Sequence, residues 1–334
     1  MRKNITIQDV AEHAGVSMMT VSRVLNKGGN VKDSTRQKIE QAVQDLGYRP
    51  NFAAKNLSSG RKNFIGVLCF EPNSPYVSQF LFGCLRYCSE VGYHLIVEEN
   101  NADRLLDSKL QALCSGVDGV IVLPPLSEDK SLLERISAFN IPYVCVGQQH
   151  MALQDKFHST VSIDEQQAAA DLTSSLIEQG HTRIGFISGD KSQGVTQLRL
   201  AGYQQALQQH KLSIQPELIA EGDFSYKSAL SATEQLLSLK DKPSAIFASN
   251  DEMAAAVMAV VHKHQFAIPK DISVVGFDDT SIATMVWPQL TTVRQPFVEM
   301  AKAAIDRISG QNPDAKTLLP SSITCRESHG QAAN

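Results

Sequence analysis

Residues 6–26, TIQDVAEHAGVSMMTVSRVLN, carry side chains whose types and spacing suit contact with DNA. Thr6 can cap a first helix, with Asp9 at the third helical position as in a capping box. Gly15 then stands in a tight turn, and Ser17 can cap a second helix. Two capped helices joined by a glycine turn form a helix-turn-helix unit, whose second helix enters the DNA major groove with its N-terminal end first.

The second helix of this unit separates its apolar from its polar side chains. The helical period places Val21, Val24 and Leu25 inward, and Met18, Met19, Ser22, Arg23 and Asn26 outward. Arg23 is the one outward side chain able to form a bidentate pair of hydrogen bonds with guanine, worth about 1–3 kcal/mol of discrimination. Met18 and Met19 could fill gaps in a core, but the inward residues already occupy that side. We therefore expect the two methionines to contact thymine methyl groups or base faces.

A third helix and a short linker complete the N-terminal part. The apolar stripe of the third helix, at about residues 34–46, consists of Ile39, Ala42, Val43 and Leu46, and Gly47 ends it. The following segment, NFAAKNLSSG, has little apolar surface to bury and should fold only against a partner. We expect a DNA-binding domain at residues 1–50 and a hinge helix at residues 51–61.

The charge of the chain is distributed unevenly. Residues 1–62 hold 11 Lys and Arg against five Asp and Glu, a net charge of +6, whereas the remainder has a net charge of −10. A basic N-terminal part on an acidic body is typical of a chain whose N-terminal part alone binds a polyanion, because bound cations displace the condensed counterions of DNA. A merely solvated basic surface is the alternative that charge alone leaves open.

From Phe64 onward, apolar strands alternate with amphipathic helices, from FIGVLCF at residue 64 to SVVGFDD at residue 273. Repeated strand–helix units predict parallel sheets flanked by helices, and this series is too long for one sheet of ordinary size. We therefore expect two similar α/β halves, with a ligand in the cleft at the carboxyl ends of their strands. Nothing in the sequence marks where the chain crosses between the halves.

Three polar residues, Arg199, Asn250 and Asp278, each stand beside a predicted strand end or helix start, where this cleft should lie. Charged and amide groups of this kind can pair with adjacent hydroxyls of a sugar, while an aromatic face covers the C–H side of the ring. Side chains of these types could therefore bind a polar ligand in the cleft.

Both parts of the chain resemble one family. The segments TIQDVAEHAGVSMMTVSRVLN and YRPNFAAKNLSSGR (48–61) look like the DNA-binding head and hinge of LacI/GalR-family transcription regulators. The resemblance continues through GHTRIGFISG (180–189), RLAGY (199–203), ASND (248–251) and VVGFDDTSIA (274–283), so it covers nearly the whole chain. It implies a helix-turn-helix head, a hinge helix and a core like that of periplasmic sugar-binding proteins, with two Rossmann-like α/β subdomains joined by three crossovers.

The resemblance assigns the DNA-binding residues of the head and hinge. Thr6 belongs to this set, Ser17, Thr20, Ser22 and Asn26 would anchor phosphates or nearby groups, and Met18, Met19 and Arg23 would face bases. In the hinge, Leu57 would wedge into the minor groove and kink the duplex, with Asn51, Ala54 and Lys55 along the same minor-groove or phosphate track. The alternative for Leu57 is packing within its own unit.

The resemblance also assigns the effector cleft. Arg199, Asn250 and Asp278 match the family's effector-binding residues, Phe224 stands where an aromatic often stacks on the sugar, and Phe70 would line the opposite half. Either phenylalanine could instead be a core residue. Gln148 is a weaker candidate for a hydroxyl contact, because many relatives carry a charged residue there.

Other chemistries find little support in the sequence. The six cysteines lack CxxC pairs or histidine partners at metal spacing, so we expect reduced thiols and no metal site. His181 and Asp164 have no nucleophile beside them in a recognisable motif, and GDKSQG (189–194) lacks the Lys-Ser/Thr ending of a phosphate-binding loop. No signal peptide or long apolar run is evident, which favours the cytoplasm. We expect no enzyme activity, no catalytic residue and no cofactor.

The predicted protein is thus a sequence-specific transcription regulator, a repressor of carbohydrate-utilisation genes, that binds a palindromic operator as a homodimer under control of a small sugar or related metabolite. We expect an N-terminal subdomain at about 62–160 plus 292–325 and a C-terminal subdomain at about 161–291, within a dimerising core of residues 62–334. The C-terminal tail shows no heptad pattern, which favours a dimer over a tetramer. A sugar-binding receptor without DNA binding and an α/β enzyme are the alternative function classes.

Overall fold

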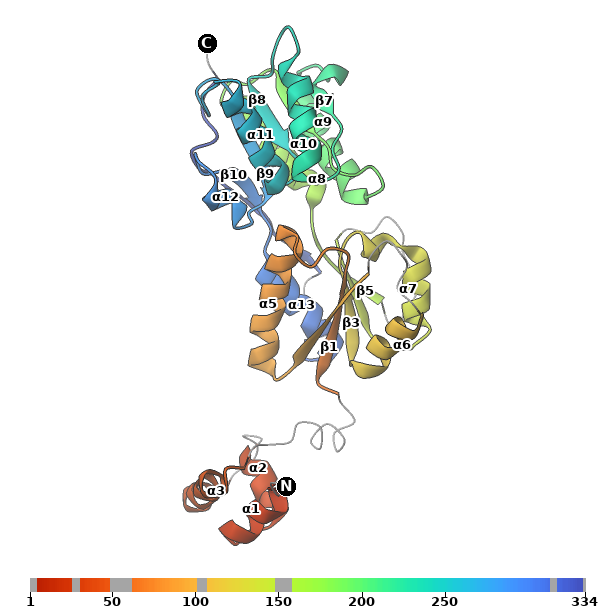
Figure 1. The fold of residues 1–334 in the computed structure, drawn as a ribbon, viewed down its shortest axis with the longest axis vertical. Coiled ribbons are helices and arrows are strands. Elements are labelled where there is room, and N and C mark those ends of the chain that lie inside the picture. Colours follow the sequence, from red (N-terminus) through yellow and green to blue (C-terminus); the bar gives the residue numbers. More distant parts are fainter. Residues whose placement is uncertain are drawn as a thin grey trace. The chain divides into compact units, whose positions relative to one another are not determined.

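The computed structural model describes residues 5–25, 31–48, 62–100, 107–147, 158–312 and 317–332 (Figure 1). Its chain divides into two units, residues 1–62 and residues 63–334, called the head and the body below.

The described head contains three helices: α1 (Ile7–Ala14), α2 (Met18–Leu25) and α3 (Asp33–Leu46). The predicted capping box is present, because the Thr6 backbone N–H donates to Asp9 Oδ2 at 2.7 Å and the Asp9 N–H donates to Thr6 Oγ1 at 3.3 Å. Gly15 ends α1 with a φ of 65°, a left-handed conformation that glycine adopts without steric cost. The two helix boundaries therefore follow from local sequence.

The three helices of the head share one small core. Val10, Val21 and Ile39, one from each helix, are completely buried, and Val24, Ala11 and Ala42 pack around them. Leu25 packs against this cluster from its edge. The inward side predicted for the second helix is confirmed, and the core fixes which face of α2 remains outside.

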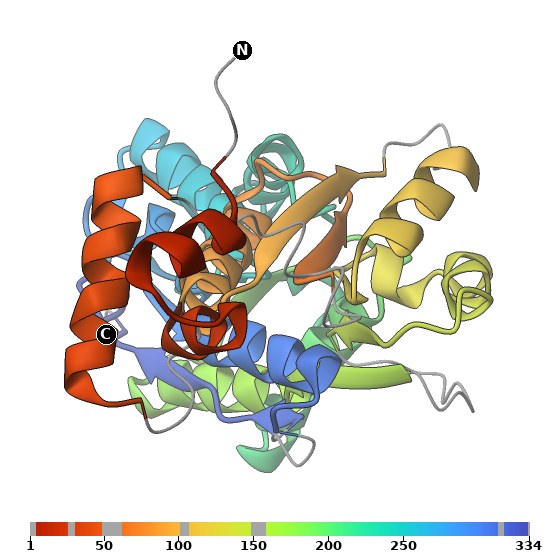
Figure 2. The same ribbon diagram turned by 90° about the horizontal axis from the view of Figure 1, so that it is seen from below.

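The N-terminal subdomain of the body is built on a six-stranded sheet in the order β11-β5-β4-β3-β1-β2. Its strands are β1 (Phe64–Cys69), β2 (His94–Glu99), β3 (Gly119–Val122), β4 (Tyr143–Val146), β5 (His158–Ile163) and β11 (Leu318–Leu319), all paired in parallel. The helices α5 (Pro75–Val91) and α13 (Phe297–Ser309) cover one face, and α6 (Asp107–Gly116) and α7 (Lys130–Ser137) cover the other (Figures 1 and 2). The short helix η1 (Leu126–Glu128) follows β3.

The C-terminal subdomain has a second six-stranded sheet in the order β12-β10-β9-β8-β6-β7. Its strands are β6 (Ile184–Ile187), β7 (Ile219–Ala220), β8 (Ala245–Ala248), β9 (Ser273–Asp278), β10 (Thr291–Arg294) and β12 (Ser322–Thr324), of which only β12 pairs antiparallel. Its helices are α8 (Glu165–Glu178), α9 (Gly194–Gln209), α10 (Tyr226–Leu237), α11 (Asp251–Lys263) and α12 (Ile282–Met285), and η2 spans Pro216–Leu218.

Side chains of alternate strand residues meet the two helical layers of this second sheet. Phe186 and Phe247 pack with residues of α8 and α9, whereas Ile187 and Ile246 pack with residues of α10 and α11. Because both faces are covered, these strands are continuously apolar rather than alternating. That pattern is why the sequence indicated parallel sheets.

The described chain passes between the two sheets at three places: after β5, between β10 and α13, and between β11 and β12. Residues 161–163 therefore lie in the N-terminal sheet, and residues 292–294 and 322–324 lie in the C-terminal sheet, which moves the subdomain boundaries expected from the sequence. Strand pairing sets these positions, since Val161 pairs with Val146 and Thr292 pairs with Gly276.

His181 and Asp164, beside which the sequence shows no catalytic motif, both have hydrogen-bond partners in the fold. His181 is 1% exposed, its Nδ1 lies 2.9 Å from Ser244 Oγ, and its Nε2 lies 3.0 Å from the Gly330 carbonyl oxygen. Asp164 caps α8 by accepting a hydrogen bond from the Gln167 N–H at 3.0 Å. These contacts give both residues a structural role: Asp164 caps a helix, and His181 holds the C-terminal tail against the body.

We expect the His181 contacts to make the body less stable in mild acid. Burial lowers the pKa of both His181 and His329 below 6.5. The unfolded chain then binds more protons than the folded chain as the pH falls through 6.5, so the free energy of unfolding decreases. Thermal unfolding between pH 7.5 and 5.5 tests this. His181→Gln should show a smaller loss of melting temperature than the wild type, and an equal loss in both would show that His181 is not responsible.

Candidate functional site

The outer face of α2 presents the side chains predicted to contact bases. Met18 and Met19 are 50% and 65% exposed, and Arg23 is also exposed. Arg23 Nη2 lies 3.5 Å from Met19 Sδ, one helical turn away, so these two side chains form one continuous surface. This surface combines an apolar contact for a thymine methyl group with a guanidinium group suited to guanine.

The hydroxyl groups near the helix starts of the head act as caps. Ser17 Oγ accepts a hydrogen bond from the Thr20 N–H at 3.3 Å and lies 2.9 Å from Thr20 Oγ1. Thr6 caps α1, and Ser22 lies half-buried on α2. Helix N-termini favour phosphate groups, which is consistent with the phosphate-anchoring role expected at these positions. The other predicted DNA contacts, Asn26, Asn51, Ala54, Lys55 and Leu57, lie outside the described residues.

The body contains a cleft of about 440 Å³ lined by both subdomains. The N-terminal subdomain contributes residues that follow β1, β3 and β4, among them Phe70, Tyr76, Pro124 and Gly147. The C-terminal subdomain contributes Glu165, Asp190, Arg199, Phe224, Asn250 and Asp278, among others. Five of the six predicted effector residues, Phe70, Arg199, Phe224, Asn250 and Asp278, line this cleft, and Gln148 lies outside the described residues.

Arg199 is the centre of a buried polar network in the cleft wall. Its side chain is 4% exposed, and its Nε donates to Glu165 Oε2 at 2.8 Å. Nη1 donates to the Ser249 carbonyl oxygen, and Nη2 lies 3.5 Å from Asp278 Oδ1. The guanidinium carbon also lies 3.7 Å from the centre of the Phe277 ring. Arg199 therefore lies between two acidic groups of the cleft wall, and each of its three nitrogens has a partner in the protein.

Asp278 ends β9 with a φ of 110°, a backbone conformation that side-chain-bearing residues rarely adopt. Its Oδ1 accepts a hydrogen bond from Gln295 Nε2 at 2.8 Å. Gln295 belongs to the crossover between β10 and α13. Burial raises the pKa of Asp278, and the nearby Arg199 opposes this shift. Asp278 thus joins the cleft wall to one of the connections between the subdomains.

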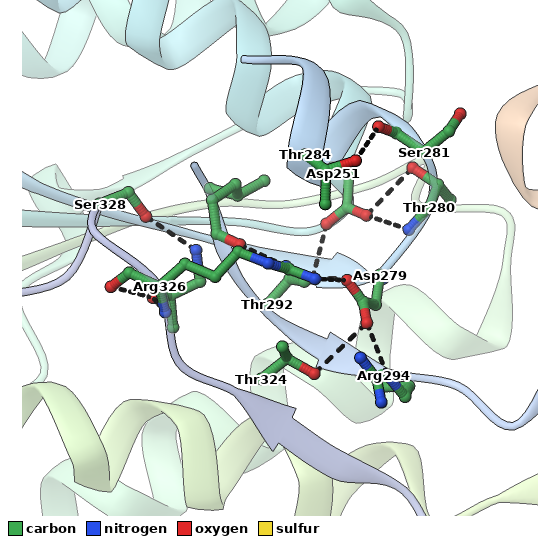
Figure 3. A network of polar contacts seen from close by, with 12 residues as sticks. Asp251, Asp279, Thr280, Ser281, Thr284, Thr292, Arg294, Thr324, Arg326 and Ser328 are labelled. Atoms are coloured by element: carbon green, nitrogen blue, oxygen red, sulfur yellow. Dashed lines mark hydrogen bonds and ion pairs between the residues drawn. The ribbon is translucent and has the colours of Figure 1, made fainter. Parts of the chain in front are cut away.

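A second set of contacts supports this strand end (Figure 3). Asp251 accepts hydrogen bonds from the Thr280 N–H and from Thr292 Oγ1, both at 2.6 Å, and burial raises its pKa. Asp279 accepts from Arg294 Nε and from Arg326 Nη2, also at 2.6 Å each. These bonds tie the two residues that follow Asp278 to α11, to β10 and to the segment after β12, so they hold the backbone on the C-terminal side of Asp278.

Asn250 and Phe224 meet in the wall of the same cleft. Asn250 Oδ1 caps α11 by accepting from the Met253 N–H at 2.8 Å, and Asn250 Nδ2 donates to the Phe224 carbonyl oxygen at 3.0 Å. The Phe224 ring packs over Gly189 so closely that a Cβ there would lie 2.0 Å from its Cζ. The glycine therefore lets the aromatic ring lie in the cleft wall.

Several lining residues were missed by the sequence. Tyr76 packs edge-on against Phe297, with ring centres 5.2 Å apart, and burial raises its pKa. Glu165, the partner of Arg199, begins α8 immediately after the first crossover. Each follows a strand end, which is the signal that could have identified them.

Comparison with known proteins places both units of the chain. The family model described as bacterial regulatory proteins, lacI family, matches residues 6–51, and a periplasmic binding protein-like domain matches residues 173–329. Catabolite control protein A of Priestia megaterium is 35% identical over 305 residues, which cover 90% of this chain and 91% of the relative. The chain belongs to the LacI family.

Two solved structures of this family match the full length of the fold. The lac repressor dimer bound to operator and the anti-inducer ONPF has a TM-score of 0.76 at 28% identity, covering 98% of this chain and 99% of that one. The complex of the transcriptional regulator CelR with cellobiose has a TM-score of 0.71 at 30% identity, covering 97% and 99%. The predicted head, the two-sheet core and the function of a DNA-binding transcription regulator are confirmed by LacI-family membership.

The described part of this LacI-family chain shows no helix long and apolar enough to cross a membrane. Within the same residues, no group of three or more His, Cys, Asp and Glu side chains is placed to hold a metal ion. The cysteines are in the reduced form, and burial raises the pKa of Cys84 and, to about 11, that of Cys88. The matched relatives named above are regulators rather than enzymes.

Proposed function

We propose that this protein represses carbohydrate-utilisation genes by binding a palindromic operator as a homodimer, and that a small sugar in the body cleft changes its affinity for that operator. The observation that carries this proposal is the cleft, which draws polar and aromatic side chains from both subdomains. A ligand held there contacts both halves at once, so its binding depends on how they are arranged. The protein would act in the cytoplasm, where its DNA is found, and no catalytic step is part of the proposal.

The division of labour follows the expected domains. Residues 1–50 would read DNA through the α2 surface, residues 51–61 would supply the hinge contacts of Asn51, Ala54, Lys55 and Leu57, and residues 62–334 would bind effector and dimerise. The lac repressor dimer on its operator supports this arrangement by similarity. Two heads related by a two-fold axis require symmetric half-sites.

The cleft suits a sugar in its chemistry and size. Its volume of about 440 Å³ lies in the range of small-molecule sites. The Asp278 and Asn250 side chains offer acceptors and donors for hydroxyl groups, while the Phe70 and Phe224 rings can cover apolar ring faces. Gln148 would add a hydroxyl contact, because its neighbour Gly147 lines the cleft. The match to the CelR complex with cellobiose supports the same ligand class.

Coupling between effector and DNA would pass through the crossovers. Asp278 faces the cleft and binds Gln295 in one crossover, so an effector that engages Asp278 also acts on the connection between the subdomains. If the effector changes the affinity for operator by some factor, operator DNA must change the affinity for the effector by the same factor.

We propose that the dimer forms through the body. Met285 and Trp287, at and just after α12, are 78% and 77% exposed, and Phe82, Leu85 and Val298 expose apolar side chains on α5 and α13. Aromatic residues of this size are frequent anchors of protein interfaces. Within the described residues, these are among the most exposed large apolar side chains.

The double variant Met285→Glu/Trp287→Glu should weaken the dimer by more than about 100-fold, because anchor residues each contribute roughly 2 kcal/mol or more and a two-fold interface contains each residue twice. Sedimentation velocity over a range of protein concentrations measures this change. Gln208→Glu, which adds a negative charge at an exposed polar residue of α9, is the control and should leave the dimer intact. If the double variant dimerises as strongly as the wild type, the interface does not include Met285 and Trp287.

Selection of binding sites from random-sequence DNA tests the proposed function. The full chain should enrich a symmetric sequence and bind it more tightly than unrelated DNA at moderate salt, where nonspecific phosphate contacts are weakened. Failure to enrich any sequence, together with sugar binding to the cleft, would favour the sugar-binding receptor instead.

A further inference from the structure

In the part of the chain that the structure describes, the charged side chains that line the cleft are almost all acidic. Among the residues that the structure describes, Arg199 is the single lysine or arginine in the lining, and the acids are Glu71, Glu165, Asp190, Asp223, Asp251, Glu252 and Asp278. An anionic ligand would need a cation or free N–H groups in this wall, because an unpaired charge removed from water is strongly disfavoured.

The positive charge of Arg199 is already paired within the wall, with Glu165 and Asp278. Each of its three guanidinium nitrogens already contacts an acceptor of the protein, and Phe277 covers one face of the group. Separating Arg199 from Glu165 would leave a buried carboxylate unpaired. The charge of the guanidinium group is therefore offset by its own carboxylate partners, which weakens its attraction for a phosphate or carboxylate.

Helix N-termini are the other common anion sites, and at those that border the cleft the chain's own side chains accept hydrogen bonds from N–H groups of the first turn. At α5, Ser74 Oγ accepts from the Val77 N–H at 3.4 Å. At α9, the Gly194 N–H donates to Glu128 Oε2 at 2.8 Å, and Glu128 belongs to the opposite subdomain. At α10, the Tyr226 N–H donates to Glu252 Oε1 at 3.1 Å. At α11, Asn250 caps the first turn. An incoming phosphate would have to displace these groups.

The glycine-containing loop before α9 is closed to a phosphate for the same reason. Asp190 Oδ1 accepts hydrogen bonds from the Ser192 N–H at 2.8 Å and from Ser192 Oγ at 2.7 Å. Thr196 Oγ1 donates to the Asp190 carbonyl oxygen at 2.6 Å. The loop that superficially suited a phosphate therefore folds around a carboxylate of its own.

Four carboxyl groups of the lining lie outside the buried network: Glu71, Asp190, Asp223 and Glu252. They are exposed or half-buried, and hydrogen bonds from Ser225 and Ser228 lower the pKa of Asp223, which keeps it ionised at neutral pH. Carboxylates attract the hydroxyl hydrogens of an uncharged ligand and repel a second anion.

From this arrangement we propose that the cleft selects an uncharged polyhydroxyl effector and excludes phosphorylated or carboxylated sugars. This inference rests on the effector role proposed above and specifies the ligand class. It means that the regulator responds to a sugar before a kinase has phosphorylated it or an oxidation has converted it to a sugar acid.

Calorimetric titration of the full chain with matched compounds tests the inference. A panel of neutral mono- and disaccharides is screened first by thermal shift, together with glucose 6-phosphate, ribose 5-phosphate and gluconate. At least one neutral sugar should bind, and the anionic relative of a bound sugar should bind at least about tenfold more weakly, the effect of one repelled charge at short range. The difference in affinity between the neutral sugar and its anionic relative should decrease as the salt concentration rises, because salt screens the repulsion between the ligand and the carboxylates.

A charge variant separates repulsion from steric exclusion. Glu71→Gln/Glu252→Gln should narrow the gap between a neutral sugar and its phosphate, whereas Glu178→Gln/Glu217→Gln, which removes two exposed charges away from the lining, should not. The inference is overturned by an anionic compound that binds as tightly as its neutral relative. It is also overturned if no neutral sugar binds, and operator binding measured alongside would then show whether the regulator itself has failed.

Discussion

Arg23→Ala should lower affinity for the selected operator by at least about tenfold, because a bidentate arginine–guanine pair contributes roughly 1–3 kcal/mol and the dimer would lose one pair in each half-site. Arg23 is exposed on α2, and its nearest described contact is Met19 Sδ, so its removal leaves the core of the head intact. Affinity for unrelated DNA should fall much less, since only a charge is lost there. Fluorescence anisotropy with both DNAs measures the two effects.

Lys38→Ala is the matched control for this variant. Lys38 is an exposed residue of α3. Its substitution removes one positive charge, as Arg23→Ala does, but at a position away from the α2 surface. This variant should weaken binding to operator and to unrelated DNA slightly and by the same factor, so the preference for operator should not change. An Arg23→Ala protein that retained its preference for operator would place base recognition elsewhere in the head.

Arg199→Met should destabilise the body by about 3–5 kcal/mol, the usual cost of leaving a buried charge without its partner. The substitution keeps much of the side-chain volume, so the loss comes from Glu165 rather than from a cavity. The loss of the Arg199 contact to Asp278 should contribute less to the destabilisation, because burial raises the pKa of Asp278 and so favours its protonated form. Chemical unfolding followed by circular dichroism measures the change.

The double variant Glu165→Gln/Arg199→Met tests that explanation. Replacing the unpaired carboxylate by an amide should recover much of the lost stability, so the double variant should be more stable than Arg199→Met alone. Two independent losses that simply add would instead show that Glu165 and Arg199 are not coupled.

The head could be predicted closely because its structure is determined by neighbouring residues. The Thr6–Asp9 capping box, the left-handed Gly15 and the inward Val21 all follow from spacing within a few positions. The exposure of Met18 and Met19 follows in turn, because the inward side of α2 is filled.

The cleft was predictable in part. Arg199, Asn250 and Asp278 could be chosen because they lie beside strand ends, where ligands of parallel sheets bind. The hydrogen-bond partners of Arg199 and Asp278 could not be predicted from strand-end positions. Glu165 and Gln295 come from crossovers, and the bond from Gly194 to Glu128 joins residues of different subdomains.

The crossovers themselves were not predictable, because strand partners far apart in sequence determine them. Residues 291–294, TTVR, form a short strand beside β9, and their composition does not distinguish one sheet from the other. We expected about residues 292–325 in the N-terminal subdomain; α13 and β11 lie there, but the end of β10 and β12 pair within the C-terminal sheet.

The central claim is that a sugar in the body cleft controls operator binding by the head. The most direct test is the dissociation constant for the selected operator, measured by anisotropy with and without a saturating neutral sugar found to bind the full chain. We predict a change of at least about fivefold, the lower end of ordinary allosteric coupling, and a much smaller change in Asp278→Asn. Equal dissociation constants with and without the bound sugar would contradict the account.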